Sequence, residues 1–587
     1  MSLFFPPAWI LLAGSILVPY FKGETRNWTV IALMILSLGF IISLEPGSYW
    51  QVQFFGFELT LLRVDKLSKL FGIIFTLYGF ATSVYSFYLR DSQQHVAALW
   101  YIGSALGVVF AGDLVSLYFY WEIMAVASVM LILARRTPQA MQAGFRYILV
   151  HIFGGLCLLA GIVISIVQTG SVAFEPFAVH NLANYLILLG ILVNAAAPPV
   201  SAWLPDAYPE ATVTGSVVLS AFTTKTAVYT LIRGFPGWEI LIVIGCIMTL
   251  YGIFYALLEN DMRRILAYSI INQVGFMVTG VGIGTAVALN GAAAHAFAHI
   301  IYKGLLFMSA GSVLYMTGKS KCTDLGGLYK TMPLTLIFGA VGALAISAFP
   351  MTSGFTTKSL IMKGAVYEHL VWAWLVLEIA SAGVFLHAGI KFPYFVFFAK
   401  DKGLRPGETN TPMLLGMGLL AFLCFFLGLY PQPLYDILPY AMEPYQAYTA
   451  AHLTTQMQLL MLSALVFFLF LPLLKRTDTI SLDTDWFYRK GGRAVFNLLD
   501  RTLNGLNVRA ERMLRTFVSF VADFFKDAFA QVALFFVVTF WLLRGDGGKR
   551  LEIKKAMLYS DITQGTLPIG IGAGIATTFI VLIFLLS

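Results

Sequence analysis

The stretch VALNGAAAHAFAHIIYKGLLFMSAG, residues 287–311, decides the class of the fold. It is apolar and long enough for a helix that crosses a bilayer, which needs about 20 residues. Within it His295, His299 and Lys303 recur at every fourth position, so their side chains share one face of that helix. A charge at the centre of such a helix costs about 2.5–3.5 kcal/mol. We therefore expect this face to point into a helix bundle and not toward lipid.

The same composition extends along the whole chain. Its 587 residues are 59% hydrophobic and 12% charged, and the mean hydropathy is +0.80. A soluble chain carries about 25% charged residues, and the repeated apolar runs predict an all-α polytopic membrane protein with about 16 transmembrane helices. The expected spans are 4–20, 27–45, 65–88, 95–112, 114–134, 143–168, 182–204, 210–233, 238–258, 263–284, 289–317, 333–360, 371–398, 413–430, 455–474 and 566–586.

Two of these spans are interrupted, at Pro198 and Pro199 in the first and at Pro350 and Gly354 in the second. Proline removes a helical hydrogen bond, which is tolerated at membrane depth only where the freed backbone lines protein or a cavity. Paired interruptions in two halves of a chain are typical of transporters built from inverted repeats. We therefore predict two inverted five-helix repeats with one broken helix each.

The spacing of similar residues supports this division. Lys391 follows Lys225 by 166 residues, Lys358 follows Asn194 by 164, and HIIYKGL at His299 follows HIFGGL at His151 by 148. The predicted domains are 1–94 with three spans, the repeats 95–235 and 238–400, 401–476 with two further spans, 477–545, and 546–587 with a linker and the last span.

Residues 477–545 differ from the rest, because apolar residues recur there at helical spacing while the arginines lie mostly off that stripe. This pattern predicts a long amphipathic helix. It would lie along the membrane surface or a partner as a lateral helix, or it would pack on its own bundle, and the sequence leaves both alternatives open.

Loop charges and cysteines bound the setting of the chain. Basic residues gather in alternate loops, which places the N-terminus and, with sixteen spans, the C-terminus outside the inner membrane of a bacterial or archaeal cell. The four cysteines are scattered without a CxxC pair, so no metal or iron–sulfur centre is expected. GVGIGT at Gly280 follows no strand and is not a dinucleotide motif, so no cofactor is expected.

Eleven ionisable residues fall within the predicted spans: Glu122, Arg146, His151, Lys225, His295, His299, Lys303, Lys358, Glu378, His387 and Lys391. Half a dozen such charges would cost about 15–20 kcal/mol in lipid, more than a typical domain's stability, so they must face protein or water. His387 has the alternative of an ordinary core histidine, Glu378 that of a local ion pair, and Lys391 that of a side chain reaching to the interface.

Two explanations compete for the column at residues 295–303. Histidines four residues apart can bind zinc, but no third ligand follows at suitable spacing and Lys303 would repel a cation. Imidazoles titrate near neutrality, and lysines approach it when they are desolvated. A column of two histidines and a lysine therefore indicates passage of protons.

Several motifs then resemble one family. FYWEIMAVAS, PVSAWLPDAYPEATVTGSVVLSAFTTKTAVYTLIR, ENDMRRILAYSIINQVGFM, HAFAHIIYKGLLFMSAG, LGGLYKTMP and FPMTSGFTTKSLIM are similar to the antiporter-like subunits of respiratory complex I, membrane-bound hydrogenases and Mrp sodium/proton antiporters. The resemblance covers roughly residues 60–430 and is strongest to the D-type protein of Mrp antiporters and its hydrogenase-associated relatives. The tail is similar in layout to the lateral helix of the largest antiporter-like subunit of complex I.

The resemblance implies a proton relay through the middle of the membrane. The matching residues are Glu122, Lys225, His295, His299, Lys303 and Lys358, with His151, Lys391, Asn194 and Arg146 as secondary candidates. The family usually has a lysine where this chain has Asn194, and an amide cannot hold a proton at neutral pH. Glu122 would then pair with Lys225 or Arg146, or the first repeat would not conduct.

The implied function is a proton-translocating, antiporter-like membrane subunit of a multi-subunit cation/proton antiporter, or of an ion-pumping respiratory or hydrogenase complex. Its expected partners are the other membrane subunits of that assembly and protons, with sodium as a second candidate ion, and no nucleic acid. Two alternatives stay open: a non-pumping scaffold of such a complex, and the energising subunit of an inorganic-carbon uptake system.

Overall fold

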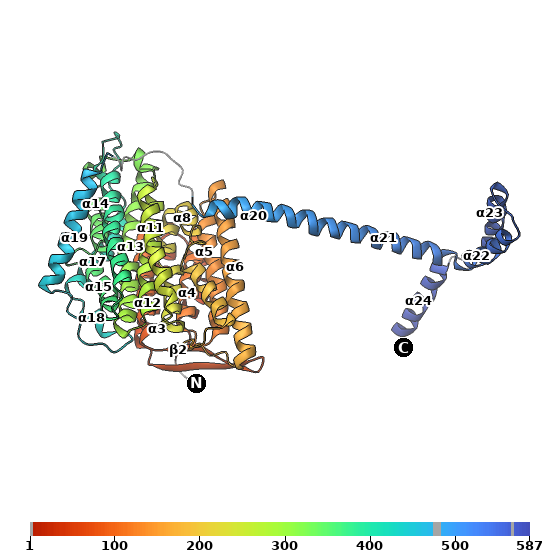
Figure 1. The fold of residues 1–587 in the computed structure, drawn as a ribbon, viewed down its shortest axis with the longest axis horizontal. Coiled ribbons are helices and arrows are strands. Elements are labelled where there is room, and N and C mark those ends of the chain that lie inside the picture. Colours follow the sequence, from red (N-terminus) through yellow and green to blue (C-terminus); the bar gives the residue numbers. More distant parts are fainter. Residues whose placement is uncertain (1–3, 473–482, 565–568, 587) are drawn as a thin grey trace. The chain divides into compact units, whose positions relative to one another are not determined.

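The structure, a computed structural model, describes residues 4–472, 483–564 and 569–586. It has two compact units, Met1–Asp485 and Trp486–Ser587 (Figure 1). Within the described residues ten helices are long and apolar enough to cross a membrane, or eleven if one sharply bent pair counts as a span. The predicted all-α polytopic class is confirmed.

The first unit is a helical bundle. Its helices are α1 (Ala8–Gly14), α2 (Gly23–Ser43), α3 (Lys66–Tyr85), α4 (Ser92–Phe110), α5 (Leu114–Leu133), α6 (Pro138–Thr169), α7 (Leu182–Asn194), α8 (Trp203–Ala207), α9 (Val213–Leu219), α10 (Thr223–Gly234), α11 (Ile240–Leu258), α12 (Met262–Ile283), α13 (Ala286–Thr317), α14 (Pro333–Ile346), α15 (Ser353–Tyr367), α16 (Val371–Val384), the π-helix η5 (Phe385–Lys391), α17 (Thr411–Leu429), α18 (Gln432–Asp436) and α19 (Ala450–Leu469).

The predicted spans map onto these helices with two differences. The span predicted at 182–204 stops as a helix at Asn194, where the proline-rich turn begins. The span predicted at 210–233 is divided into α9 and α10 by a break at 220–222, which contains neither glycine nor proline. The break predicted near Pro350 is present between α14 and α15.

The second unit contains α21 (Gly505–Lys526), α22 (Ala528–Leu543), α23 (Lys549–Thr563) and α24 (Ile569–Leu586), and it begins within α20 (Asp485–Leu499). The predicted amphipathic character of this region is present, because apolar side chains such as Phe517 and Leu514 are exposed on α21. The first residues of the predicted ranges 477–545 and 566–586 lie outside the described residues.

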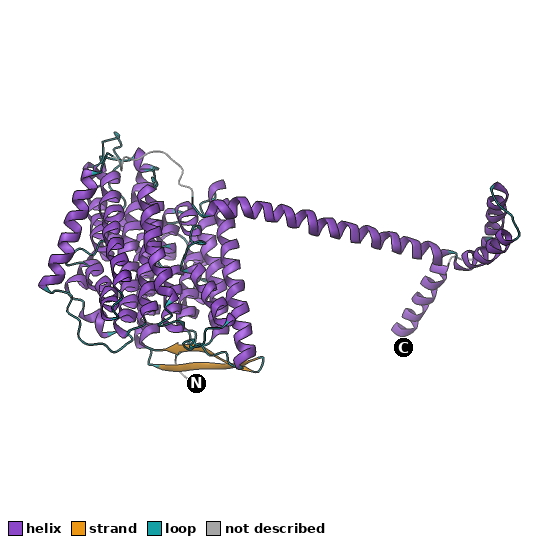
Figure 2. Ribbon diagram, viewed as in Figure 1, coloured by secondary structure: helices purple, strands orange, loops and turns teal. Residues whose placement is uncertain are grey.

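A β-hairpin occupies the interval between the spans predicted at 27–45 and 65–88 (Figure 2). Strands β1 (Gly47–Phe54) and β2 (Phe57–Val64) pair antiparallel, with Phe54 opposite Phe57. The two turn residues, Phe55 and Gly56, both have positive φ, as a tight hairpin turn between twisted strands requires. The sequence analysis predicts no strand here, although β-branched and aromatic residues alternate with polar ones.

Helix bounds in the two predicted repeats recur at a constant offset. An offset of 148 residues separates both ends of α4 from those of α11, and both ends of α6 from those of α13. Helix-capping residues follow the same offset: Asp113 and Asp261 cap α5 and α12, while Gly170 and Gly318 end α6 and α13 in the left-handed conformation. These bounds support two related units, and the inverted orientation of the second stays a prediction.

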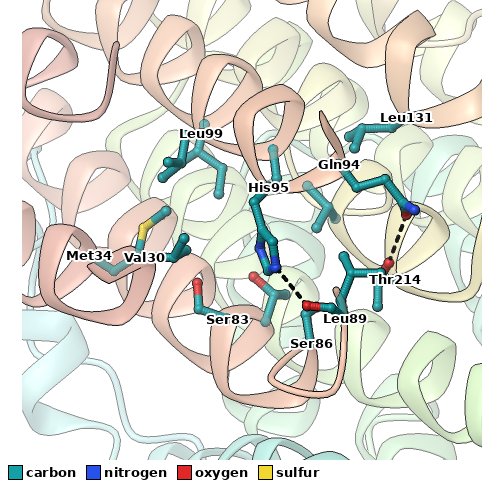
Figure 3. Close-up of a pocket in the computed structure, with 15 residues that line it drawn as sticks. Val30, Met34, Ser83, Ser86, Leu89, Gln94, His95, Leu99, Leu131 and Thr214 are labelled. Carbon is teal, nitrogen blue, oxygen red and sulfur yellow. Dashed lines mark hydrogen bonds between the residues drawn. The ribbon is translucent and has the colours of Figure 1, made fainter. Parts of the chain in front are cut away.

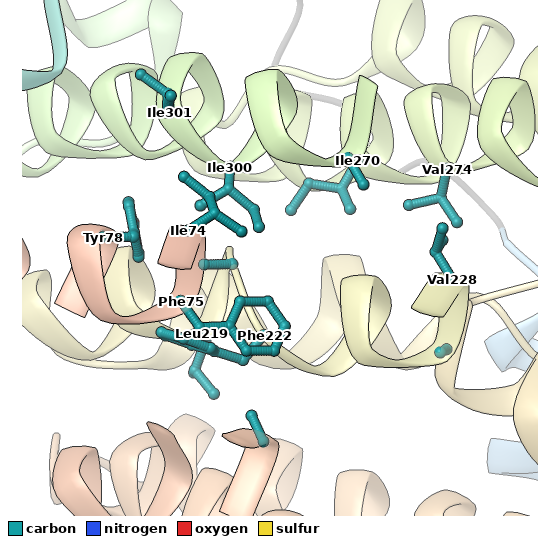
Figure 4. Packing of buried hydrophobic residues seen from close by; sticks show 14 of the residues in the cluster. Ile74, Phe75, Tyr78, Leu219, Phe222, Val228, Ile270, Val274, Ile300 and Ile301 are labelled. Atoms are coloured by element: carbon teal, nitrogen blue, oxygen red, sulfur yellow. The ribbon is translucent and has the colours of Figure 1, made fainter. Parts of the chain in front are cut away.

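Helices α12 and α13 form the buried centre of the first unit. In their most apolar windows 100% and 94% of the residues are buried within the protein. Figure 4 shows Phe75 of α3, Phe222 beside the α9–α10 break and Ile300 of α13 in this core, with the rings of Phe75 and Phe222 edge to face at 5.1 Å. Polar residues on α12 and α13 are therefore surrounded by protein and not by lipid tails.

Asp483 anchors the end of the first unit to this bundle. Its carboxylate is buried and accepts hydrogen bonds from the hydroxyls of Tyr251 on α11 and Tyr268 on α12, the latter at 2.6 Å. Asp483→Ala would leave both phenols without this partner, at about 1–3 kcal/mol for each buried unsatisfied group. We expect a clearly lower Tm in detergent by calorimetry. The exposed Asp523→Ala is the control, and equal Tm values for the two variants would contradict the anchoring role.

Candidate functional site: a buried column of basic side chains

The predicted column on α13 lies inside the bundle. His295, His299 and Lys303 are all fully buried. Neither ring nitrogen of His299 nor the Nζ of Lys303 has a hydrogen-bond partner among the described residues. Unpaired buried polar groups each cost about 1–3 kcal/mol, so their retention here indicates a use other than holding the fold together.

Lys225 enters the column from the break between α9 and α10. It lies in the first turn of α10, is fully buried, and its Nζ donates a hydrogen bond to the carbonyl of Ser220. The break exposes that carbonyl because Ser220 follows the last residue of α9 and begins no continuing helical hydrogen bond. The interrupted backbone therefore provides a polar partner for a lysine at membrane depth.

Lys358 is held in the same way at the second break. Its Nζ donates to the carbonyl of Ile346, the last residue of α14, at 3.2 Å and lies 5.0 Å from the ring centre of Phe276. Both lysines end the sequence Phe-Thr-Thr-Lys, at 222–225 and 355–358. That shared tetrapeptide is the signal from which the unpredicted α9–α10 break could have been found.

His295 connects the column to both neighbouring helices. Its Nε2 lies 3.0 Å from Gln273 Oε1 on α12, and its Nδ1 lies 3.1 Å from Thr357 Oγ1 on α15. Tyr302 also donates to Gln273 Oε1, at 3.1 Å. Sequence reasoning missed Gln273, Thr357 and Tyr302, although the pair Asn272–Gln273 is conspicuous in an otherwise apolar helix.

This arrangement accommodates His295 both neutral and protonated. Because an amide oxygen only accepts, Nε2 carries a hydrogen in either state. The Thr357 hydroxyl lies 2.9 Å from the carbonyl of Ser353 as well as 3.1 Å from Nδ1. It donates to Nδ1 when the ring is neutral and to Ser353 when Nδ1 itself carries a proton. His295 can therefore gain and lose a proton while only one hydroxyl rotates.

Charges from both repeats reach this column. Lys225 interacts electrostatically with His299 and Lys303, and Lys358 interacts with His295 and His299. In a low-dielectric interior such charges couple strongly, so a proton gained at one group disfavours a proton on the next. The structure thus brings together five of the six principal predicted residues.

Glu122, the sixth, stands apart from them. It lies on α5 against Gly155 of α6, so closely that a Cβ on that glycine would come within 2.2 Å of Oε1. Neither expected pairing of Glu122 is present: Arg146 forms a bidentate ion pair with Asp206 at 2.7 and 2.9 Å, and Lys225 binds the α9–α10 break. Within the described residues Oε1 has no hydrogen-bond partner.

His151 and Asn194 lie in the same half of the bundle as Glu122. The His151 ring stacks on Tyr147 at 3.9 Å and meets Trp203 edge to face at 4.6 Å. Its Nδ1 bonds the Tyr147 carbonyl, and its buried Nε2 has no partner among the described residues. Both side-chain amide atoms of Asn194 are likewise buried and unpartnered there.

Lys391 and Glu378 complete the set of membrane-depth charges. Lys391 is fully buried, so it does not reach to the interface, and its Nζ donates to the carbonyls of Ala256, Leu257 and Glu259 at the end of α11. A cation is favourable at the negative end of a helix. Glu378 on α16 interacts electrostatically with Lys358.

Other possible sites are weak by comparison. Among the described residues no three His, Cys, Asp or Glu side chains form a metal-binding group. A cavity of about 30 Å³ beside His95 and Gln94 has room for a single water (Figure 3). There His95 bonds the Leu89 carbonyl at 3.1 Å and Thr212 donates to Gln94 at 2.8 Å, so the polar groups are largely satisfied.

Residues 111–384 match the family described as NADH:quinone oxidoreductase/Mrp antiporter, transmembrane. This segment belongs to that family. The antiporter-family segment contains Glu122, Lys225, the α13 column and Lys358, whereas His387 and Lys391 lie beyond its end.

Relatives and solved structures agree with that assignment. The chain is 27% identical over 476 residues to proteins named Na(+)/H(+) antiporter subunit A1 from Staphylococcus aureus strains JH9 and N315, covering 71% of this chain and 59% of the relative. It therefore spans about three fifths of the length of these relatives. The sequence motifs resemble the D-type protein of Mrp antiporters most strongly, whereas these relatives bear the name subunit A1.

Two solved structures share the fold. The Mrp complex from Dietzia sp. DQ12-45-1b contains a chain with TM-score 0.74 and 24% identity, aligned over 90% of this chain and 62% of that chain. An archaeal membrane-bound sulfane sulfur reductase contains one with TM-score 0.73 and 24% identity, aligned over 88% and 99%. The antiporter-family segment therefore sits within a fold that extends over most of the chain.

Proposed function

We propose that this chain is the proton-translocating, antiporter-like subunit of a multi-subunit cation/proton antiporter in the inner membrane, with both termini outside. Protons would pass along Lys225, His299, Lys303, His295 and Lys358, with Glu122 at the start of the first repeat. The observation that carries this proposal is the set of buried, electrostatically coupled basic side chains that extends between the two helix breaks.

The geometry suits protons better than a resident cation. The column consists of amines and imidazoles, and carboxylate or carbonyl cages that would hold a metal ion do not surround it within the described residues. His295 has partners for both protonation states, and Lys225 and Lys358 are each stabilised by a carbonyl freed at a break. Each group can therefore be charged or neutral without the bundle unfolding.

Partners follow from the relatives' printed names. The Staphylococcus aureus proteins are called subunits of a Na(+)/H(+) antiporter, and the Dietzia structure is an Mrp complex. We propose that this chain also works within an assembly of membrane subunits and exchanges protons for a monovalent cation such as sodium. The exposed apolar side chains of the second unit would contact such partners or lipid.

His299→Gln tests the proposal. Glutamine keeps hydrogen-bonding capacity but cannot bind a proton at neutral pH, so we expect cation-dependent proton movement across everted vesicles to fall at least about tenfold. The assay follows a fluorescent pH indicator after addition of sodium, in membranes that contain the whole complex.

The matched control is His180→Gln, because His180 is an exposed histidine in the loop before α7. Co-purification of the remaining subunits shows that the variant complex has assembled. Proton movement by an assembled His299→Gln complex at the rate of the control would overturn the proposal.

A further inference from the structure

The span that contains α16 changes into a π-helix, η5, at Phe385. π-Helical turns are rare and occur frequently at functional sites, because they displace a residue from the regular helical register. This one packs closely against the α14–α15 break, since a Cβ on Gly389 would come within 2.4 Å of Ser347 Oγ. The residues of η5 therefore lie beside the backbone that holds Lys358.

His387, in the middle of η5, has one ring nitrogen in use and one idle. It is fully buried, and its Nδ1 lies 2.8 Å from the carbonyl of Gly383. A carbonyl can only accept, so Nδ1 carries the hydrogen and the neutral ring leaves a lone pair on Nε2. That Nε2 has no hydrogen-bond partner among the described residues. A histidine retained only for packing would be expected to bond both nitrogens.

The charged groups facing His387 are lysines from three elements. They are, in order of electrostatic effect, Lys303 on α13, Lys391 on η5 and Lys358 on α15. Lys391 donates to three backbone carbonyls, which uses all three hydrogens of an ammonium group. It is therefore a fixed positive charge one turn from His387 and has no lone pair with which to accept a proton.

Lys303 differs from Lys391 in this respect. Its Nζ is buried and, within the part of the chain that is described, bonds nothing, as is also true of His387 Nε2. The two atoms are thus farther apart than a direct hydrogen bond, and exchange between them requires one intervening water. The fixed charge of Lys391 makes a proton on His387 short-lived, which suits a transfer step better than storage.

We propose that His387 exchanges protons with Lys303 and is a branch by which protons enter or leave the column. This inference rests on the proposed function. A proton passes from the Lys303 ammonium, through water, to the lone pair of His387 Nε2, which leaves a neutral amine and an imidazolium. Nε2 then releases its proton to water on the side away from Lys303, and the Nδ1–H bond to Gly383 stays intact throughout.

The test uses His387→Ala in the assembled complex. We expect cation-dependent proton movement in everted vesicles to fall at least about tenfold, since a positioned proton carrier contributes on that order or more. Added imidazole, which can enter the space left by the side chain and carry a proton, is expected to restore a substantial part of the rate. His180→Ala is the matched control and should neither lose activity nor respond to imidazole.

Each outcome bears on the inference. A His387→Ala complex that keeps the control rate, or loses it without rescue by imidazole, overturns the role of His387. If His299→Gln loses proton movement while His387→Ala keeps it, the proposed function stands and only this branch fails. If His299→Gln keeps proton movement and His387→Ala loses it with rescue by imidazole, His387 carries protons and the column proposed for the function is wrong.

Discussion

Lys303→Met is expected to abolish proton movement and, at the same time, to raise the thermal stability of the chain. Methionine has nearly the length of lysine and no charge, so it fills the same space without a proton-binding group. The buried Nζ has no hydrogen-bond partner among the described residues, and a buried charge costs about 2.5–3.5 kcal/mol on membrane-insertion scales. Removing that cost should add up to about 2–3 kcal/mol to the free energy of unfolding.

Two measurements check this pair of effects. Proton movement is followed in everted vesicles, and Tm is measured on the purified complex in detergent. Lys319→Met, at an exposed position just after α13, is the control and should change neither quantity. A Tm below that of the unsubstituted protein would mean that Lys303 has a structural role, and retained proton movement would remove it from the relay.

Gly354→Ala is expected to have the largest effect on folding. A Cβ at this position would lie 1.9 Å from the carbonyl oxygen of Ala345, far inside van der Waals contact. That oxygen belongs to the last turn of α14 and cannot withdraw as a side chain could, so the two half-helices must move apart. Overpacking of this kind costs about 1–3 kcal/mol and occasionally more. Lys358, one turn further along α15, would lose its bond to Ile346.

The readouts are the yield of assembled protein by size-exclusion chromatography and its Tm. Gly39→Ala is the matched control, because Gly39 is also helical and a Cβ there would meet nothing within 4 Å. That control should be neutral or stabilising, since alanine favours a helix by about 1 kcal/mol over glycine. Equal yields and Tm values for the two variants would show that the break at Gly354 is not tightly packed.

Parts of the fold could be predicted from sequence because they depend on local pattern. The apolar runs and the Asp and Gly capping residues set the helix bounds to within a few residues, for example 263–284 against Met262–Ile283. The β-hairpin and the α9–α10 break were not predicted. The first is short and isolated, and the second has no proline or glycine to mark it, because tertiary packing around Phe222 holds the interrupted backbone.

The candidate site divides in the same way. The i, i+4 spacing of His295, His299 and Lys303 places them on one helix face, and their cost in lipid requires that face to be buried. No spacing rule relates Gln273 or His387 to that face, since they come from other helices. The pairings expected for Glu122 failed for the same reason, because Asp206 and the α9–α10 break supply closer partners for Arg146 and Lys225.

By itself, then, the sequence determined that the chain is a membrane-spanning helical bundle with a column of basic groups inside it, because hydropathy and helical period act along one segment at a time. Only the tertiary structure decided which of those groups have partners. Lys225, Lys358 and Lys391 bind carbonyls at helix ends, whereas His299 and Lys303 bond nothing within the described residues. That difference depends on distances between segments far apart in the chain, and hydrogen bonds form only over a few ångströms.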